Sequence, residues 1–160
     1  MFLTKKKFTL HFILFFSIFA LVTAYFVQYV LNHQPCNLCL IERIPYFSAV
    51  ILIPMIFFLN KYEKTISTVV ALFFIFGSIV SFYHVGIEQG FFNESLVCDL
   101  APNSNNMSTK ELLKELERKT VSCKDVTFVF LGFSLATFNA IFSLALSAIM
   151  IKNIKYYGKN

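Results

Sequence analysis

The chain has 160 residues, of which 57% are hydrophobic and 14% are charged, and its mean hydropathy is +0.67. A soluble domain of this size could not bury so much apolar surface, so the composition excludes an ordinary water-soluble domain and indicates a protein of the lipid bilayer. The formal net charge of +5 reflects lysines clustered in the connections between apolar runs, so it indicates membrane topology and not nucleic-acid binding.

Four apolar runs predict an all-α membrane protein, a bundle of four transmembrane helices in one domain over residues 1–160. Each run is close to the roughly 20 residues that cross a hydrocarbon core of roughly 30 Å. The predicted helices span approximately residues 8–31, 40–59, 65–87 and 126–151. The first follows three lysines, as in a signal peptide, but it is longer than a signal's apolar region of roughly 7–15 residues and lacks a clear cleavage site, so we predict a retained helix.

The distribution of lysines predicts the orientation of these helices. Lysines stand in the N-terminal segment, in the turn 60–64 and near the C-terminus, which places these segments and both termini on the cytoplasmic side. The outer connections are then residues 32–39 and 88–125, and they contain all four cysteines: Cys36, Cys39, Cys98 and Cys123. Disulfides form and persist on the outer side of the membrane.

The long outer loop and the fourth helix carry two further patterns. Ser108 to Glu111 fits a capping box, and an apolar stripe of leucines follows, which predicts a short amphipathic helix on the bilayer surface or against the end of the bundle. Small residues recur in the predicted fourth helix, which favours close packing of helices: Gly132, Ala136, Ala140, Ser143 and Ser147.

The first outer connection contains a Cys-x-x-Cys pair at the start of the second helix. Pro35 suits the first position of a helix, so Cys36 and Cys39 fall in its first turn, where unpaired N–H groups favour thiolates. Arg43 follows Cys39 by four residues, so both thiols and the cation are predicted to share one helical face. A permanent charge at that depth is costly and therefore indicates a functional site.

The most suitable electron acceptor for such a pair is a quinone dissolved in the membrane, because the chain has no glycine-rich nucleotide fingerprint and no soluble domain for a flavin. His84 and Glu88 lie one turn apart in the third helix, and His84 could donate a hydrogen bond to a quinone carbonyl. We predict a quinone site formed by Arg43, His84, Glu42 and Glu88, with no metal. The alternatives are structural contacts of His84 with Glu88, and pairing of Arg43 with Glu42, Glu88 or lipid head groups.

The second cysteine pair leaves several interpretations open. A disulfide between Cys98 and Cys123 would close a long loop and stabilise the fold by roughly 3–4 kcal/mol. A bridge between Cys36 and Cys39 closes almost no loop, which favours a redox use for that pair. The alternatives are two inert disulfides in a structural membrane protein, and a zinc site built from all four cysteines, for which one Cys-x-x-Cys with two scattered partners is a weak pattern.

These motifs together resemble the DsbB family of disulfide-bond-forming proteins of the bacterial inner membrane. The resemblance spans nearly the whole chain and is carried by the C-N-L-C-L-I-E-R element of residues 36–43, by Tyr83-His84, by the cysteines of the long loop and by FLGFSLATFNA at the start of the fourth helix. A vitamin-K-epoxide-reductase-like protein would use similar chemistry, but the position of the Cys-x-x-Cys in the second helix fits it less well.

The resemblance implies a relay of disulfides on the periplasmic side of a multi-pass protein. A reduced, thioredoxin-fold DsbA-like partner would attack the Cys98–Cys123 disulfide, with Cys98 forming the mixed disulfide. Cys123 would then exchange with the first pair through Cys36. Cys39 would meet the quinone, either ubiquinone or menaquinone, beside Arg43.

Overall fold

The structure, a computed structural model, describes residues 2–58, 60–93, 98, 122–124, 129–130 and 132–157. Within these residues, four helical spans are long and apolar enough to cross a membrane: Lys7–Tyr29, Asn37–Phe58, Glu63–Glu88 and Leu135–Lys155. The predicted four-helix membrane protein is therefore confirmed. The predicted amphipathic helix of the long loop lies outside the described residues.

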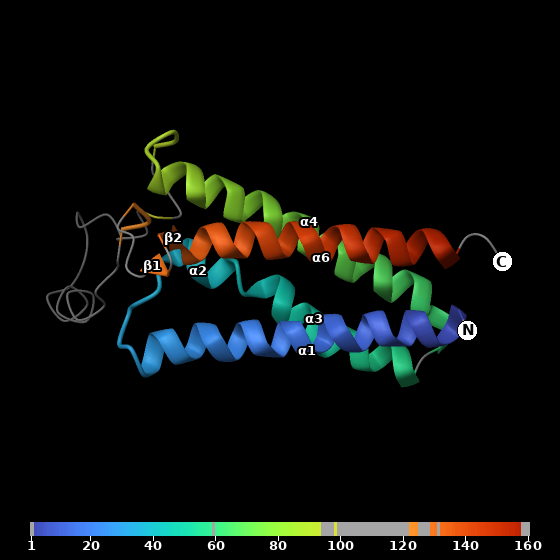
Figure 1. The fold of residues 1–160 in the computed structure, drawn as a ribbon. Helices are drawn as coiled ribbons and strands as arrows, with labels where there is room; N and C mark the ends of the chain where they lie inside the picture. Colours follow the sequence, from blue (N-terminus) through green and yellow to red (C-terminus); the bar gives the residue numbers. More distant parts are fainter. Residues whose placement is uncertain are drawn as a thin grey trace, which may run out of the picture.

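The elements follow one another as a bundle with a small hairpin at one end (Figure 1). Their bounds are α1 Phe2–Tyr29, α2 Asn37–Ile41, α3 Ile44–Phe58, the 3-10 helix η1 Asn60–Tyr62, α4 Glu63–Glu88, β1 Val129–Phe130, β2 Phe133–Ser134 and α6 Leu135–Tyr157. Helix α3 packs between α1 and α4, and α6 packs chiefly against α4. Helix α1 begins and α6 ends at the same end of the bundle, whereas α2 and the hairpin lie at the opposite end (Figure 1).

The second membrane span is not the single helix over 40–59 that the sequence predicts. It begins earlier, with Cys36 as the N-cap of α2, and it is interrupted at residues 42–43 before α3. The cause is Pro45, which lacks the N–H that would donate to the carbonyl of Ile41. The N–H of Arg43 instead bonds to the Leu40 carbonyl at 3.2 Å, one residue closer than in an α-helix. The break therefore separates the Cys-x-x-Cys turn from the rest of the span.

The fourth membrane helix begins at Leu135 and not near residue 126, as the sequence predicts. Before it, β1 and β2 pair antiparallel, with Val129 opposite Ser134, and Gly132 adopts a φ of +85° in the turn. A glycine tolerates this left-handed conformation without a steric penalty. The hydroxyl of Ser134 accepts the N–H of Thr137 at 3.2 Å and so caps the first turn of α6.

The core runs along the contact between the four spans, and large aromatic side chains such as Phe8, Phe15 and Phe82 are exposed on the outside. This outward apolar surface is what a lipid environment requires. The central cluster contains Leu10, Ile13, Tyr46, Ala49, Ile53, Val70, Phe74, Leu146 and Met150. Small residues permit the closest approach of helices: a Cβ added to Gly77 of α4 would lie 2.6 Å from Pro45 Cγ of α3. Of the predicted small-residue stripe, Ala136, Ser143 and Ser147 are buried, whereas Gly132 lies before the helix.

Candidate redox site

The Cys-x-x-Cys pair occupies the N-terminal turn of α2. Cys36 is the N-cap, and its sulfur accepts the backbone N–H of Cys39 at 3.2 Å. The two sulfur atoms lie 2.7 Å apart, and both residues are free cysteines. The side chain of Cys36 is buried, whereas that of Cys39 is partly exposed.

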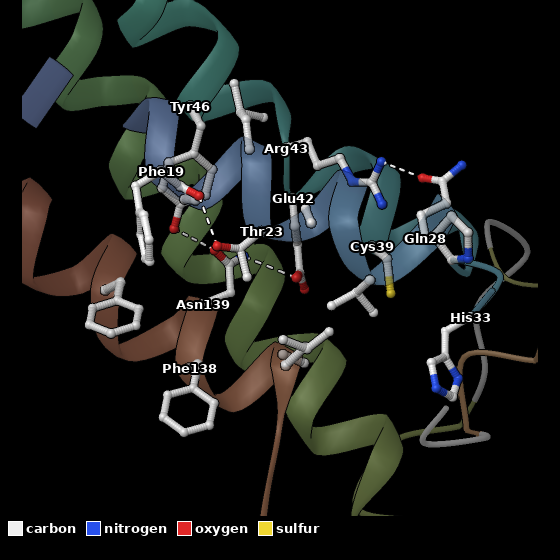
Figure 2. A pocket seen from close by; sticks show the side chains of 18 of the residues that line it. Phe19, Thr23, Gln28, His33, Cys39, Glu42, Arg43, Tyr46, Phe138 and Asn139 are labelled. Atoms are coloured by element: carbon white, nitrogen blue, oxygen red, sulfur yellow. Dashed lines mark hydrogen bonds between the residues drawn. The ribbon is translucent and has the colours of Figure 1, made fainter. Parts of the chain in front are cut away.

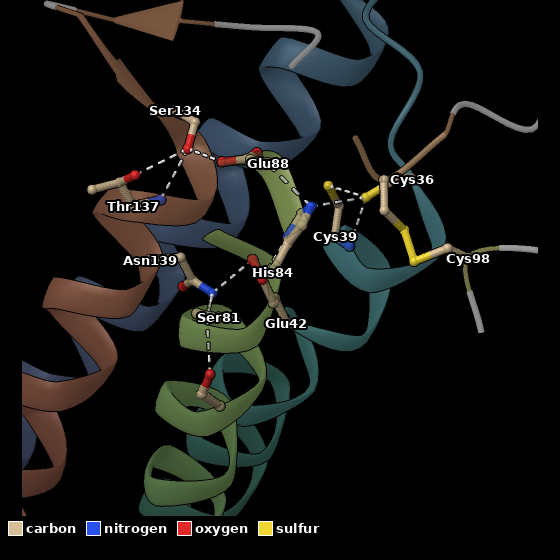
Figure 3. Close-up of polar contacts among 12 residues, drawn as sticks. Cys36, Cys39, Glu42, Ser81, His84, Glu88, Cys98, Ser134, Thr137 and Asn139 are labelled. Carbon is tan, nitrogen blue, oxygen red and sulfur yellow. Dashed lines mark hydrogen bonds and ion pairs between the residues drawn. A yellow bond between two sulfur atoms is a disulfide. The ribbon is translucent and has the colours of Figure 1, made fainter. Parts of the chain in front are cut away.

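The second pair, Cys98 and Cys123, forms a disulfide with a Cα–Cα distance of 5.7 Å. Both residues are buried and pack with Cys36, Leu38 and Ile87 in one apolar cluster. Figure 3 shows the disulfide of Cys98 beside Cys36. The fold thus brings together two pairs that lie far apart in the sequence. While this bond is formed, Cys98 and Cys123 cannot act as thiolate ligands of the four-cysteine zinc site that we considered.

Three hydrogen-bonding groups surround the sulfur of Cys36. The hydrogen bond with the Cys39 thiol is the strongest influence, and together with His84 and the Cys39 N–H it lowers the pKa of Cys36 to about 5, although burial acts in the opposite direction. The ordinary value for the thiol is 9.0. These contacts therefore favour the thiolate form of Cys36 over its thiol form.

His84 joins Cys36 to a buried carboxylate. Its Nε2 lies 3.5 Å from Cys36 Sγ, and its Nδ1 lies 2.8 Å from Glu42 Oε1 (Figure 3). Its Nε2 also lies 3.9 Å from Glu88 Oε1, so the alternative of a His84–Glu88 contact has a structural basis. The second oxygen of Glu88 accepts the hydroxyl proton of Ser134.

The carboxylate of Glu42 is fixed from the other side by Asn139 of α6. The Asn139 amide donates to Glu42 Oε2 at 3.0 Å and to Ser81 Oγ at 2.7 Å, and its oxygen accepts the hydroxyl proton of Tyr46. This polar chain joins three spans. Sequence reasoning did not single out Asn139 or Ser81, although an asparagine inside an apolar helix was a signal that could have indicated a functional role.

A cavity of about 190 Å³ lies beside Cys39, between α1, the connection before α2, the break after α2 and the start of α6. Its wall contains Cys39, Glu42 and Arg43 together with aromatic side chains of α1 and α6 such as Phe19 and Phe138 (Figure 2). The cavity is too large for a single water, which occupies about 30 Å³ in the liquid, and its mostly apolar wall suits a ring.

Arg43 is held by α1. Its guanidinium donates to Gln28 Oε1 at 2.7 Å (Figure 2). It also lies over the ring of Tyr25, 5.0 Å from the centroid. Such cation–π and hydrogen-bonding contacts keep the cation beside the cavity. Of the four residues predicted for the quinone site, Arg43 and Glu42 line this cavity, whereas His84 and Glu88 lie outside its lining, on the side of Cys36.

Known proteins are similar to this chain over most of its length. A family model described as "Disulfide bond formation protein DsbB" matches residues 6–152, a segment that includes all four cysteines. Among curated proteins, the uncharacterized protein RP370 of Rickettsia prowazekii (strain Madrid E) is 25% identical over 146 residues, which cover 90% of this chain and 84% of the relative. No solved structure matches the chain significantly.

Proposed function

The chain belongs to the DsbB family of disulfide bond formation proteins, and from this membership we propose that it is a thiol:quinone oxidoreductase that reoxidises a soluble DsbA-like dithiol oxidase. The family and the four apolar spans identify a multi-pass membrane oxidoreductase of disulfide bond formation. The proposal adds the bacterial inner membrane as the location, the periplasmic side as the position of the cysteines, and a membrane quinone as the electron acceptor.

The observation that carries the proposal is the position of the Cys36–Cys39 pair between two partners. On one side Cys36 packs with the Cys98–Cys123 disulfide, and on the other side Cys39 borders the cavity beside Arg43. A pair in this position can receive electrons from one neighbour and pass them to a ring in the cavity. In the structure Cys98 and Cys123 are bonded to each other and Cys36 and Cys39 are not, and the proposed relay passes through this arrangement before quinone is reduced.

The thiol exchanges balance without any further reagent. A dithiol partner reduces the Cys98–Cys123 disulfide and leaves as a disulfide. Cys123 then attacks an oxidised Cys36–Cys39 pair at Cys36 and releases Cys39 as a thiolate. Attack of Cys98 on Cys123 restores the outer disulfide and leaves Cys36 and Cys39 reduced.

A quinone in the cavity would supply the acceptor for two electrons and two protons. The apolar wall fits the ring, and the donor groups of Arg43 and Gln28 fit its oxygens. His84 and Glu42 provide a path for a proton: His84 contacts Cys36, and Glu42 both contacts His84 and lines the cavity. We therefore assign His84 and Glu42 to proton movement between Cys36 and the cavity, with Glu88 supporting His84.

The test is turnover of purified protein with a reduced DsbA-like partner and short-chain ubiquinone or menaquinone analogues. Quinone absorbance and partner thiols should disappear together in equal two-electron amounts. Cys39→Ser should abolish quinone consumption. Ser78→Ala, which removes a hydroxyl bonded to its own helix in α4, should retain it. Unchanged turnover in Cys39→Ser would disprove the proposed role of that thiol, and partner oxidation without quinone loss would disprove the acceptor.

A further inference from the structure

The thiol pair and His84 also form a cluster of metal-ligand atoms. The sulfurs of Cys36 and Cys39 and a ring nitrogen of His84 all lie within 4.8 Å of one another. Two cysteines and a histidine are a donor set that favours zinc and similar borderline-soft ions. The proposed relay uses these contacts in pairs, whereas a metal ion would use all three ligand atoms at once.

The distances in the cluster can be compared with a tetrahedral zinc site. Bonds of about 2.3 Å to sulfur and about 2.0 Å to nitrogen place a sulfur and a nitrogen ligand about 3.5 Å apart, and two sulfurs about 3.8 Å apart. Cys36 Sγ and His84 Nε2 are 3.5 Å apart, which already fits. The two sulfurs are 2.7 Å apart, so they must separate by about 1 Å. Cys39 is partly exposed beside the cavity, which leaves space for this rotation.

The surroundings of His84 fit a metal ligand. Metal-bound histidines commonly give their other ring N–H to a carboxylate, which fixes the tautomer and the ring orientation. Glu42 occupies this position at 2.8 Å from Nδ1, and Asn139 fixes Glu42 in turn. The Nε2 atom consequently faces the sulfur side of the cluster, where it lies 3.5 Å from Cys36 Sγ.

We propose that the dithiol form of this protein binds one zinc-class divalent cation through Cys36, Cys39 and His84. Binding replaces the two thiol protons by two metal–sulfur bonds and releases those protons to solvent. Formation of the Cys36–Cys39 disulfide removes both sulfur ligands, so the metal-bound and disulfide states exclude each other. A bound cation would hold the pair reduced and arrest the relay, which makes the site inhibitory and goes beyond the proposed function.

The first experiment uses Co²⁺ as a spectroscopic substitute for Zn²⁺ on the full-length, reduced protein without oxygen. We expect one equivalent of Co²⁺ to give thiolate-to-metal charge-transfer bands and visible bands of tetrahedral geometry, which Zn²⁺ then removes. The double variant Cys98→Ser/Cys123→Ser should keep these bands, whereas Cys36→Ser should lose them. Bands that disappear in the Cys98→Ser/Cys123→Ser variant, or the absence of bands from the wild type, would overturn the proposal.

Separate variants test the contributions of His84 and of Glu42, the carboxylate that fixes its ring. His84→Gln should shift the charge-transfer bands and weaken binding, and Glu42→Gln should weaken binding by about 10- to 100-fold, as is typical when the partner of a metal-bound histidine is lost. Ser78→Ala is the matched control and should bind as the wild type does. Equal affinity in all three variants would remove His84 from the site.

A measurement on the wild type alone guards against variants that do not fold. One equivalent of Zn²⁺ should slow the alkylation of Cys36 and Cys39 in the reduced protein, as measured by peptide mass spectrometry, and a chelator should restore it. Equal alkylation with and without Zn²⁺ would refute the site. Because this measurement needs no quinone and no partner protein, its failure leaves the proposed oxidoreductase function untouched.

Discussion

The lowered pKa of Cys36 gives a prediction that can be worked through in numbers. The hydrogen bond with Cys39, assisted by His84, lowers the pKa of Cys36 from 9.0 to about 5. At pH 7 a thiol with an ordinary pKa is only about 1% thiolate, so the shift raises the thiolate fraction by about 100-fold. A thiolate of lower pKa is also a weaker nucleophile. When the pKa falls by about four, the loss is about 40- to 100-fold at a Brønsted coefficient of about 0.4–0.5. The two effects nearly cancel at neutral pH.

The rate at one pH is therefore uninformative, and the pH profile is the proper measurement. We would reduce the Cys98→Ser/Cys123→Ser variant and follow carbamidomethylation of Cys36 by mass spectrometry, with thiolate ultraviolet absorbance as a second readout. Below its pKa, an ordinary thiol reacts about tenfold faster for each unit by which the pH rises, because its thiolate fraction rises tenfold. We expect Cys36 to react at a constant rate from about pH 6 upward, with the midpoint near 5.

The variant His84→Gln removes one of the groups that lower the pKa, so the midpoint should move upward, whereas Ser78→Ala should leave it in place. The sign of the stability effect follows from the same shift. Since the folded pKa is lowered, the thiolate stabilises the reduced protein above the ordinary value of 9.0, and this contribution is lost as the pH falls toward about 5. A reaction rate that rises tenfold per unit up to pH 9 would refute the reasoning.

Three further predictions concern packing, the polar chain and the cavity. Gly77→Ala should lower the free energy of unfolding, measured by detergent titration, because its Cβ would meet Pro45; overpacking costs about 1–3 kcal/mol and exceeds the gain of up to about 1 kcal/mol in helix propensity. Asn139→Ala leaves a Glu42 oxygen without its donor and should cost about 1–3 kcal/mol in the same assay, and wild-type stability would contradict the importance of that bond. Arg43→Ala should raise the KM for quinone by about 10- to 100-fold, if one charge-assisted hydrogen bond of about 1.5–3 kcal/mol is lost, with the KM for the partner unchanged; an unaltered quinone KM would exclude Arg43 from that site.

The number and order of the membrane spans could be predicted from the sequence because the length of an apolar run is a strong physical signal. The ends of the spans were predicted less well. Pro45 lies close to the start of the second apolar run, and the composition of that run predicts one continuous helix. The missing N–H of Pro45 nevertheless creates the break at residues 42–43. The apolar residues before Leu135 have the composition of a membrane helix, and only Gly132 signals the hairpin that replaces its first turns.

The functional roles of the site residues stay predictions, and only part of the contacts among them could be predicted from the sequence. Sequence spacing within one helix correctly brings Cys36 and Cys39 together, because the chain itself fixes that distance. The assignment of His84 depends on how α4 is rotated against α2, which no spacing within one helix determines. The structure directs His84 to Cys36 and Glu42, away from the cavity that holds Arg43.

The contact between Glu42 and Asn139 has a consequence for the membrane insertion of the protein. Asn139 follows Glu42 by nearly a hundred residues, so its span is synthesised after the span that contains Glu42. Until α6 packs against the bundle, the buried acidic side chain lacks its amide donor, which is unfavourable inside a membrane. The polar chain behind the Cys36–Cys39 pair is therefore completed only after α6 has been inserted.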